Sequence, residues 1–117
     1  MSRRALGAQG EALAGGWYVE RGYTVLDRNW RTRQGELDLI LEREGIVVFC
    51  EVKTRTSDAF GIGAEAVTRE KQLRIRRLAG AWLTAHDRRA RELRFDVVSI
   101  LAPRGERPTI EVLEAAF

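Results

Sequence analysis

The chain has 117 residues and a mass of 13.3 kDa, which suits one domain and leaves little room for a second. Hydrophobic residues make up 44% and charged residues 32%, so the chain can bury a core and is not expected to be disordered. No uncharged run reaches ten residues, which excludes a transmembrane helix, and no apolar signal-peptide segment is expected at the N-terminus. Cys50 is the only cysteine, which excludes an internal disulfide and favours a reducing, cytoplasmic compartment.

Basic charge is unevenly distributed. The formal net charge is +3, but residues 69–94 contain nine Lys or Arg against three Asp or Glu, a net charge of +6. This distribution favours a polyanionic partner held near an acidic site, although an arginine-rich solvated helix would give the same counts. Lys53 and Lys71 are the only lysines among 20 basic residues. Because an ammonium group can adjust its pKa in a desolvated site and a guanidinium cannot, these two positions are candidates for chemistry.

The hydrophobic pattern predicts a first helix over residues 5–21, ended by Gly22. Glu11 lies along its predicted apolar stripe, which comprises Ala5, Ala8, Ala12, Gly15 and Val19. Three strands, a second helix and two more strands are predicted at 23–29, 36–43, 46–54, 64–86, 94–101 and 109–113, with loops at 32–35, 56–63 and 103–108. The apolar face of the second helix would contain Val67, Ile75, Leu78, Ala79 and Trp82. The order α-β-β-β-α-β-β predicts an α/β fold with a mixed central sheet flanked by helices.

The hairpin between the second and third strands concentrates charged residues. A two-residue turn at Glu44-Gly45 sets a register in which Asp38 lies opposite Glu51 and Glu36 lies opposite Lys53. Strand alternation then places Glu51 and Lys53 on one face. Like charges directly opposite each other destabilise a sheet unless positive charge lies between them.

Two carboxylates near Glu11 would need to raise their pKa values, separate into water or bind a cation. Oxygen ligands of this kind favour Mg²⁺ or Mn²⁺ over zinc. A bound ion would activate water and neutralise a phosphodiester in the transition state, while Lys53 would orient or help deprotonate the water. The alternative is an ordinary exposed, salt-bridged hairpin, because Glu-x-Lys spacing is common by chance.

The hairpin sequences GELDLI (35–40) and FCEVKTR (49–55) resemble those of the YraN family of bacterial proteins. Further matches extend over nearly the whole chain, at Gly10-Glu11, Arg28-Asn29-Trp30-Arg31, Phe60-Gly61, Glu65-Ala66-Val67, Lys71 and Arg94-Phe95-Asp96-Val97-Val98. That family is similar to the PD-(D/E)XK nuclease superfamily. The resemblance implies a restriction-endonuclease-like fold closest to that of archaeal Holliday junction resolvases.

By this resemblance, Asp38 corresponds to the motif aspartate, and Glu51 and Lys53 correspond to the acidic-x-lysine pair. Glu11 corresponds to the acidic residue of the first helix. The resemblance implies that Asp38 and Glu51 bind the metal, with the main-chain carbonyl of Val52 as an additional ligand and Glu11 completing or supporting the site.

Two positions depart from the superfamily pattern. Leu37 stands where the proline of the superfamily name would be, and Cys50 replaces the more usual valine as a small buried hydrophobe. Neither change removes a catalytic group, so the resemblance implies a complete catalytic set.

Nucleic-acid contacts are expected from the start of the second helix and from neighbouring arginines. Related nucleases often place a polar residue near the scissile phosphate at this position, although a lysine extending to solvent explains the pattern equally well. The expected phosphate-binding residues are Lys71, Gln72, Arg74, Arg77, Arg31 and Arg55.

Other polar and aromatic residues favour structural roles. Asp96 is expected to pair with Arg94, and His86 to lie in the last turn of the second helix. Trp17, Trp30 and Trp82 are expected in the core or in a dimer contact, with stacking on unpaired bases as a less favoured alternative.

These observations predict a Mg²⁺-dependent, structure-selective DNA endonuclease of the Holliday junction resolvase type, with Mn²⁺ as a substitute ion and no small-molecule cofactor. A homodimer is expected, because a four-way junction needs two symmetric cuts and each chain offers one site. Two alternatives remain open. One is a non-catalytic nucleic-acid-binding or adapter protein that retains the fold, and the other is an interaction domain with no nucleic-acid role.

Overall fold

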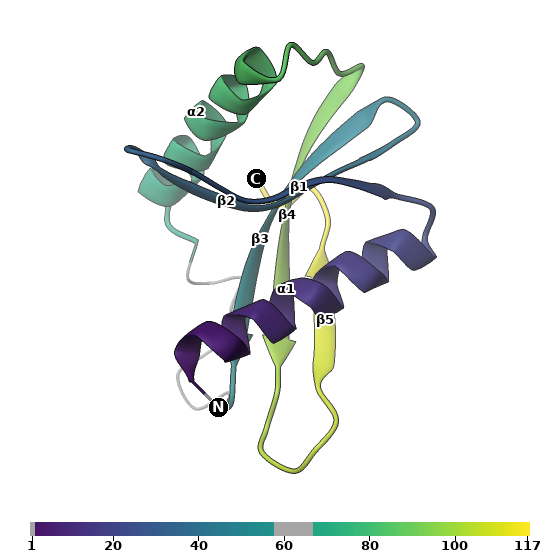
Figure 1. Ribbon diagram of the computed structural model, residues 1–117, viewed down its shortest axis with the longest axis vertical. Coiled ribbons are helices and arrows are strands. Elements are labelled where there is room, and N and C mark those ends of the chain that lie inside the picture. Colours follow the sequence, from purple (N-terminus) through teal and green to yellow (C-terminus); the bar gives the residue numbers. More distant parts are fainter. Residues whose placement is uncertain (1, 58–66) are drawn as a thin grey trace.

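The computed structural model describes residues 2–57 and 67–117 and contains one five-stranded sheet with two helices (Figure 1). The elements are α1 (Arg3–Glu20), β1 (Thr24–Thr32), β2 (Gly35–Arg43), β3 (Ile46–Arg55), α2 (Arg69–Ala85), β4 (Glu92–Leu101) and β5 (Thr109–Leu113). The predicted order α-β-β-β-α-β-β and the α/β class are confirmed. Strand β1 extends three residues beyond its predicted end at residue 29, which shortens the following loop to a turn.

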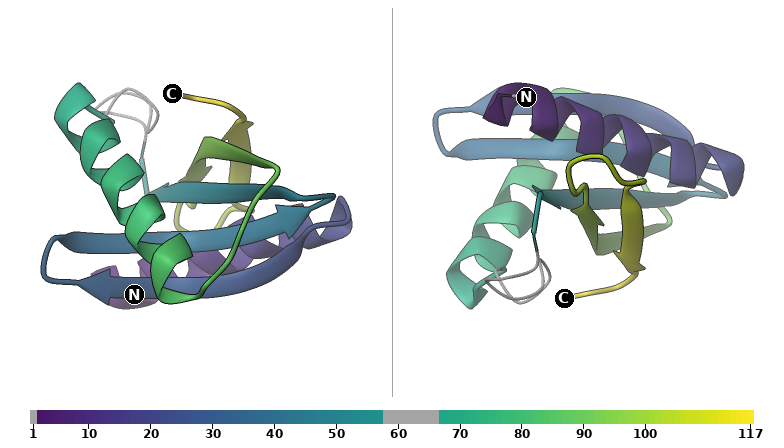
Figure 2. Two further views of the ribbon diagram at one scale, coloured as in Figure 1. Left: turned by 90° about the horizontal axis from the view of Figure 1, so that it is seen from above. Right: turned by 90° about the horizontal axis from the view of Figure 1, so that it is seen from below.

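The sheet is mixed and its spatial order follows the sequence, β1-β2-β3-β4-β5. β3 and β4 pair in parallel, while the other neighbouring strands pair in antiparallel fashion. α2 lies in the crossover between the two parallel strands, as this connection requires. The two helices lie on opposite faces of the sheet (Figure 2).

The β2–β3 hairpin has the predicted two-residue turn. Glu44 and Gly45 both have positive φ, at 52° and 82°, as in the tight turns that match the twist of a hairpin. The predicted register is confirmed from the turn to the pair formed by Leu39 and Cys50. The ladder ends there, so the predicted direct pairings of Asp38 with Glu51 and of Glu36 with Lys53 do not form.

The buried stripe of α1 shares only Gly15 with the predicted one. Gly10, Ala14, Gly15 and Tyr18 face the sheet, whereas Val19 is 53% exposed and the alanines at positions 5, 8 and 12 are also exposed. Hydrophobicity alone misassigned this face, because glycines that permit close packing and a tyrosine define it. Gly10 is the tightest point, since a Cβ there would overlap Thr54 Oγ1 and lie 2.9 Å from Thr54 Cβ.

α2 begins later than predicted. Thr68 is its N-cap and accepts a hydrogen bond from the Lys71 backbone amide at 3.1 Å, so the helix starts at Arg69 rather than residue 64. Ile75, Leu78, Ala79 and Trp82 form its buried face as predicted, and Val67 is buried just before the helix. Residues 58–66, which include most of the predicted 56–63 loop and the motif residues Phe60-Gly61 and Glu65-Ala66, lie outside the described residues.

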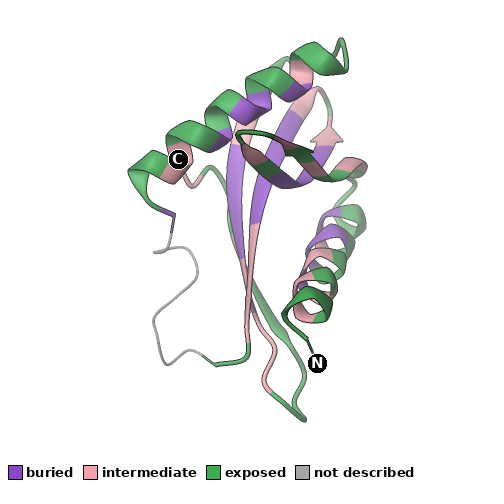
Figure 3. Ribbon diagram, turned by 60° about the vertical axis from the view of Figure 1, so that its left-hand side comes forward, coloured by how far each residue is buried: buried purple, intermediate pink, exposed green. Residues whose placement is uncertain are grey.

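Two hydrophobic layers hold the helices on the sheet. Phe49, Phe95 and Trp82 belong to the layer under α2, and Tyr18, Leu41 and Val48 belong to the layer under α1. Burial is greatest in the middle of β3 and β4 and decreases toward the ends at Arg55 and Leu101 (Figure 3). That less buried end of the sheet lies beside the N-terminal turn of α1. No helix in the described parts of the chain is long and apolar enough to cross a membrane.

Candidate metal-binding active site

A local bend in β2 places Asp38 in the site. Leu37 packs in the layer under α2, whereas Leu39 packs in the layer under α1. Residues i and i+2 of a strand normally lie on the same face of the sheet. Leu37 and Leu39 lie on opposite faces, so the strand is bent at Asp38. On β1, Asn29 lies between the residues paired with Leu39 and Leu37 and has a φ of 50°. The bend separates Asp38 from the β2–β3 ladder and leaves its carboxylate available for other contacts.

The Asp38 carboxylate lies among groups that disfavour its charge. Asp38 and Glu51 are each only 9% exposed. Asp38 Oδ2 accepts a hydrogen bond from the Val52 backbone amide at 2.8 Å, in place of the missing ladder pair. Burial, followed by the negative charge of Glu51, raises the pKa of Asp38 to about 7, although the Val52 amide opposes the change. The two carboxylates therefore form a compact acidic pair, as predicted, through a different backbone arrangement.

Both lysines reach this acidic pair. Lys71 Nζ lies 2.6 Å from Glu51 Oε1, and Lys53 Nζ lies 3.6 Å from the same oxygen. Burial and the neighbouring ammonium of Lys71 lower the pKa of Lys53. Burial is the largest single influence on Lys71 and opposes its charge, but the contacts with Glu51 and Lys53 and the negative charges of Glu51 and Asp38 together outweigh it and raise the pKa of Lys71. The geometry thus places a strongly held ammonium and a more easily deprotonated one beside the carboxylates.

A small cleft of about 170 Å³ opens onto the acidic pair between β2 and the first turns of α2. Gly35, Glu36, Lys71 and Arg74 line it together with the two carboxylates. Glu36 forms an ion pair with Arg31 at 2.8 Å, across the β1–β2 hairpin. Lys71 and Arg74 therefore line the cleft beside the acidic pair, and Arg31 lies next to it through its ion pair with Glu36.

Glu11 approaches the site without joining the carboxylate pair. Close packing of Gly10 against Thr54 brings this part of α1 to the end of β3. Glu11 interacts with the Asn29 side chain, and burial raises the pKa of Glu11. Its charge also contributes to the raised pKa of Asp38. No group of three or more His, Cys, Asp or Glu side chains arranged to hold a metal occurs among residues 2–57 and 67–117.

The donor chemistry of the acidic pair nevertheless fits a hard divalent cation. Asp38 and Glu51 offer carboxylate oxygens in a buried setting where their mutual repulsion is only partly compensated. Mg²⁺ typically uses one or two protein carboxylates and completes its coordination with water and substrate phosphate. A third protein carboxylate is therefore not required, and Glu11 fits a supporting position better than a ligand position.

The other predicted phosphate-binding residues are not gathered at this cleft. Gln72 Nε2 donates to the Val67 carbonyl at 3.2 Å, which stabilises the start of α2. Arg77 is exposed farther along that helix. Arg55 lines a separate groove beside α1. The predicted set is thus divided between two faces of the sheet.

The residues expected to be structural have structural contacts. Asp96 is fully buried and receives two hydrogen bonds from Arg94, each at 2.9 Å. His86 forms the C-cap of α2 and stacks on Trp82. Trp82 is buried and donates to Asp27 at 2.9 Å, whereas Trp17 and Trp30 are only partly buried.

Asn29 is a site residue whose role the sequence reasoning missed. It connects the bend in β1 with Glu11. A signal was present, because asparagine is depleted in strands and tolerates positive φ better than most residues. The predicted strand ended at this asparagine, whereas β1 continues through it to Thr32, so the residue type indicated a local distortion.

Comparison with known proteins identifies the family. The model of the uncharacterised protein family UPF0102 matches residues 10–100, which include Glu11, Asp38 and Glu51. This chain belongs to the UPF0102 family. A UPF0102 protein of Beutenbergia cavernae is 50% identical over 112 residues, covering 96% of this chain and 95% of the relative. One of Nocardia farcinica is 50% identical, covering 98% and 91%, and one of Clavibacter michiganensis is 48% identical, covering 95% and 94%.

The family assignment confirms the resemblance to the YraN family that the sequence motifs predicted, because the UPF0102 family is YraN-like. The matches extend along nearly the full length of this UPF0102 chain and of its relatives. The family description and the names of these relatives state no activity. Function therefore has to be inferred from the site.

Proposed function

We propose that this UPF0102 chain is a metal-dependent endonuclease that hydrolyses phosphodiester bonds in DNA, with a preference for branched structures such as four-way junctions. The observation that carries the proposal is the buried carboxylate pair of Asp38 and Glu51 with Lys53 and Lys71 beside it. A purely structural cluster would be expected to satisfy its carboxylates fully, because buried charge without compensation is costly. The resemblance of the hairpin motifs to PD-(D/E)XK nucleases supports the same reaction.

Asp38 and Glu51 would hold Mg²⁺, or Mn²⁺ in its place, with the Val52 carbonyl as a further candidate ligand. The ion would supply positive charge that stabilises the transferring phosphate in the transition state and lowers the pKa of nearby water. Ionisation of Asp38 is required for this role. Its raised pKa predicts weaker metal binding below neutral pH.

The lysines would divide two tasks. Lys53 has a lowered pKa and lies at the edge of the acidic pair, so its Nζ would orient the attacking water and accept a proton from it. Lys71 would balance the charge of Glu51 and contact the phosphate group together with Arg74, which lines the same cleft. Glu11 would support the position of Asn29, and its negative charge would add to the attraction of the site for a cation.

A homodimer would provide the two active sites that symmetric cleavage of a four-way junction needs. Each 13.3 kDa chain has one acidic pair of this kind among its described residues. Light scattering of the protein with and without junction DNA tests this part of the proposal. A dimer in either state supports it, and a monomer in both states contradicts it.

Cleavage of labelled DNA tests the proposed reaction. Four-way junction, flap, single-stranded and duplex DNA would be incubated in Mg²⁺ and in Mn²⁺ with wild type, Lys53→Ala and Lys53→Arg. We expect wild type to cut branched DNA, and both variants to lose at least about a hundredfold of the rate, because a guanidinium does not release its proton. Lys53→Arg controls for charge and should keep DNA affinity.

The same experiment separates the nuclease from the non-catalytic adapter. DNA binding without cleavage by wild type in either metal would contradict the proposal and favour the adapter. Cleavage that survives equally in both variants would indicate a contaminating nuclease or a different catalytic group.

A further inference from the structure

A basic groove lies on the α1 side of the sheet, away from the carboxylate cleft. It has a volume of about 670 Å³ and is formed by the first turns of α1, the end of β3 and the loop between β4 and β5. Each of these three segments contributes one arginine: Arg3, Arg55 and Arg104. Glu11 is the acidic residue among the groove's lining, so the groove has excess positive charge.

Within residues 2–57 and 67–117, no acidic side chain neutralises the arginines of this groove. None of the three guanidinium groups forms an ion pair with a residue in the described parts of the chain. Arg55 Nε is buried and lacks a hydrogen-bond acceptor there. Buried donors without acceptors are rare because they are costly, so this nitrogen is suited to an acceptor supplied by a ligand.

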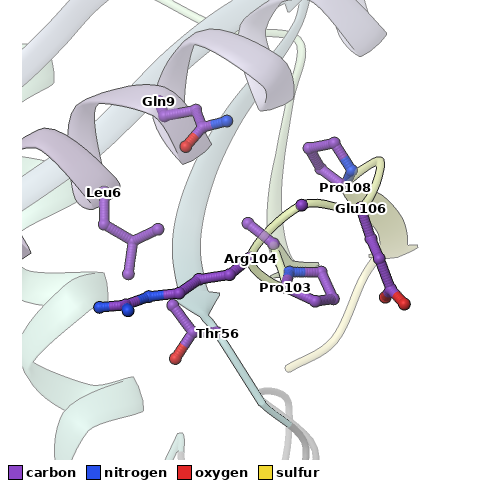
Figure 4. Close-up of a pocket in the computed structure, with 9 residues that line it drawn as sticks. Leu6, Gln9, Thr56, Pro103, Arg104, Glu106 and Pro108 are labelled. Carbon is purple, nitrogen blue, oxygen red and sulfur yellow. The ribbon is translucent and has the colours of Figure 1, made fainter. Parts of the chain in front are cut away.

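Arg104 forms the boundary of the groove. Its side chain extends from the β4–β5 loop toward Leu6 and Thr56, and the Pro103 and Pro108 rings lie behind it (Figure 4). A second hollow of about 290 Å³ lies on the proline side and shares Leu6, Thr56 and Arg104 with the groove. Backbone hydrogen bonding from Ala102 to Arg55, at 2.7 Å, fixes the base of this loop to the end of β3.

The groove is continuous with the catalytic strand. Val52, Thr54 and Arg55 line it, and the Val52 amide is the group that holds Asp38. Glu11 lies at the groove and contributes electrostatically to Asp38. A ligand in the groove would therefore lie along the same strand as Glu51 and Lys53, on its α1 side.

We propose that the groove formed by Arg3, Arg55 and Arg104 binds backbone phosphates of DNA next to the phosphate that is cut. This inference rests on the proposed function for its substrate, and it assigns a second contact surface, on the α1 side. Guanidinium groups match phosphate oxygens in pairs, and unpaired arginines from three segments suit a repeated anion better than a single carboxylate. Strong positive charge here would also offset repulsion between DNA and the acidic pair.

Binding measured without cleavage tests the groove. Fluorescence anisotropy of a labelled four-way junction and a labelled 20-nucleotide single strand would be recorded in EDTA over a range of salt concentrations. The proteins would be wild type, Arg55→Gln, Arg104→Gln and the control Arg89→Gln, which alters an exposed arginine near the end of α2. Arg104 lies in a surface loop, so its substitution tests the groove even if Arg55→Gln disturbs folding.

We expect Arg55→Gln and Arg104→Gln each to weaken binding about three- to tenfold and to reduce the slope of log affinity against log salt by about one. Arg89→Gln should leave both values within twofold of wild type. Wild-type affinity and slope in both groove variants would overturn the inference, as would absence of DNA binding by wild type. Equal losses in the control would overturn it too, because they would indicate diffuse attraction. Cleavage in Mg²⁺ is measured separately. If the groove variants bind DNA as wild type does and wild type still cuts DNA, the groove inference fails and the proposed function stands.

Discussion

Asp96 on β4 and Asp38 on β2 are both buried, but the protein surrounds them differently. Asp96 is fully enclosed and accepts hydrogen bonds from Arg94, from the Tyr18 hydroxyl at 2.6 Å and from the Ala115 amide at 3.0 Å. Arg94 is itself held by the Tyr23 hydroxyl at 2.9 Å. This network connects β4, α1 and the C-terminal segment, so its charges are compensated within the fold.

Asp38 has one backbone donor and a second carboxylate as its neighbour. Its pKa is raised to about 7, and the positive charge of Lys71 is directed to Glu51 instead. The comparison indicates that the fold can satisfy a buried aspartate when the role is structural. The incomplete compensation at Asp38 is the feature on which the proposed function rests.

The largest expected effect is loss of stability on breaking the satisfied network. Asp96→Asn leaves Arg94 as a buried charge without its partner, so the free energy of unfolding should fall by about 3–5 kcal/mol. Asp87→Asn is the matched control, because Asp87 is exposed and has a φ of 47°, which asparagine accepts. Urea denaturation measures both. A loss at Asp96 no larger than the control's would contradict the structural role.

Asp38→Asn should instead raise the free energy of unfolding, by an amount that depends on pH. The pKa of Asp38 is about 7 in the folded chain against a model-compound value of 3.8, so the folded state retains a proton that the unfolded state loses. The resulting contribution to stability is present below about pH 4 and is lost as the pH rises through 7. Relative to wild type, the variant should gain about 1–3 kcal/mol between pH 5 and pH 8. Denaturation at several pH values measures the difference in the free energy of unfolding between the two proteins. A difference that does not change with pH would contradict the claim that burial raises the pKa of Asp38.

A smaller effect is expected where α1 packs against β3. Gly10→Ala should reduce the free energy of unfolding by about 1–2 kcal/mol, because the new Cβ overlaps Thr54 and shifts the helix. Gly16→Ala is the control, since nothing lies within 4 Å of a Cβ at that position, and it should be neutral or slightly stabilising. Thermal and urea denaturation compare the two variants. Equal changes in the free energy of unfolding would show that the close packing of Gly10 on Thr54 does not limit the size of the residue at position 10.

The smallest expected effect concerns the ammonium that pairs with Glu51. Lys71→Met removes a positive charge that competes with a metal ion, so Mn²⁺ affinity should rise about three- to tenfold, equivalent to about 1 kcal/mol. Lys71→Arg, which keeps the charge, is the control. Titration calorimetry measures both. Weaker Mn²⁺ binding in Lys71→Met would indicate that Lys71 helps to build the site rather than to balance its charge.

Local sequence signals predicted the hairpin that positions Glu51 and Lys53. A Glu-Gly turn with alternating strands specifies a two-residue hairpin, and this was enough to place Glu51 and Lys53 on one face. The helix–strand order followed from the same pattern of apolar and polar residues. Such features depend on neighbours that are close in sequence.

Features that depend on packing were not predictable in this way. The bend at Asp38 replaces a ladder pair with a side-chain hydrogen bond to Val52, and alternation alone gives no signal for it. The contact of Lys71 with Glu51 depends on how α2 docks on the sheet. Glu11 was expected to complete or support the site, and the sequence could not decide between the two, because the packing of Gly10 on Thr54 is what brings it to Asn29.

Mn²⁺ binding to the unmodified chain tests the central claim most directly. Calorimetry at pH 8, where Asp38 is ionised, should detect one ion per chain. Asp38→Asn should abolish binding, while the control Asp87→Asn should retain it. Absence of Mn²⁺ binding by wild type, or binding that persists unchanged in Asp38→Asn, would contradict the claim that this carboxylate pair is a cation site.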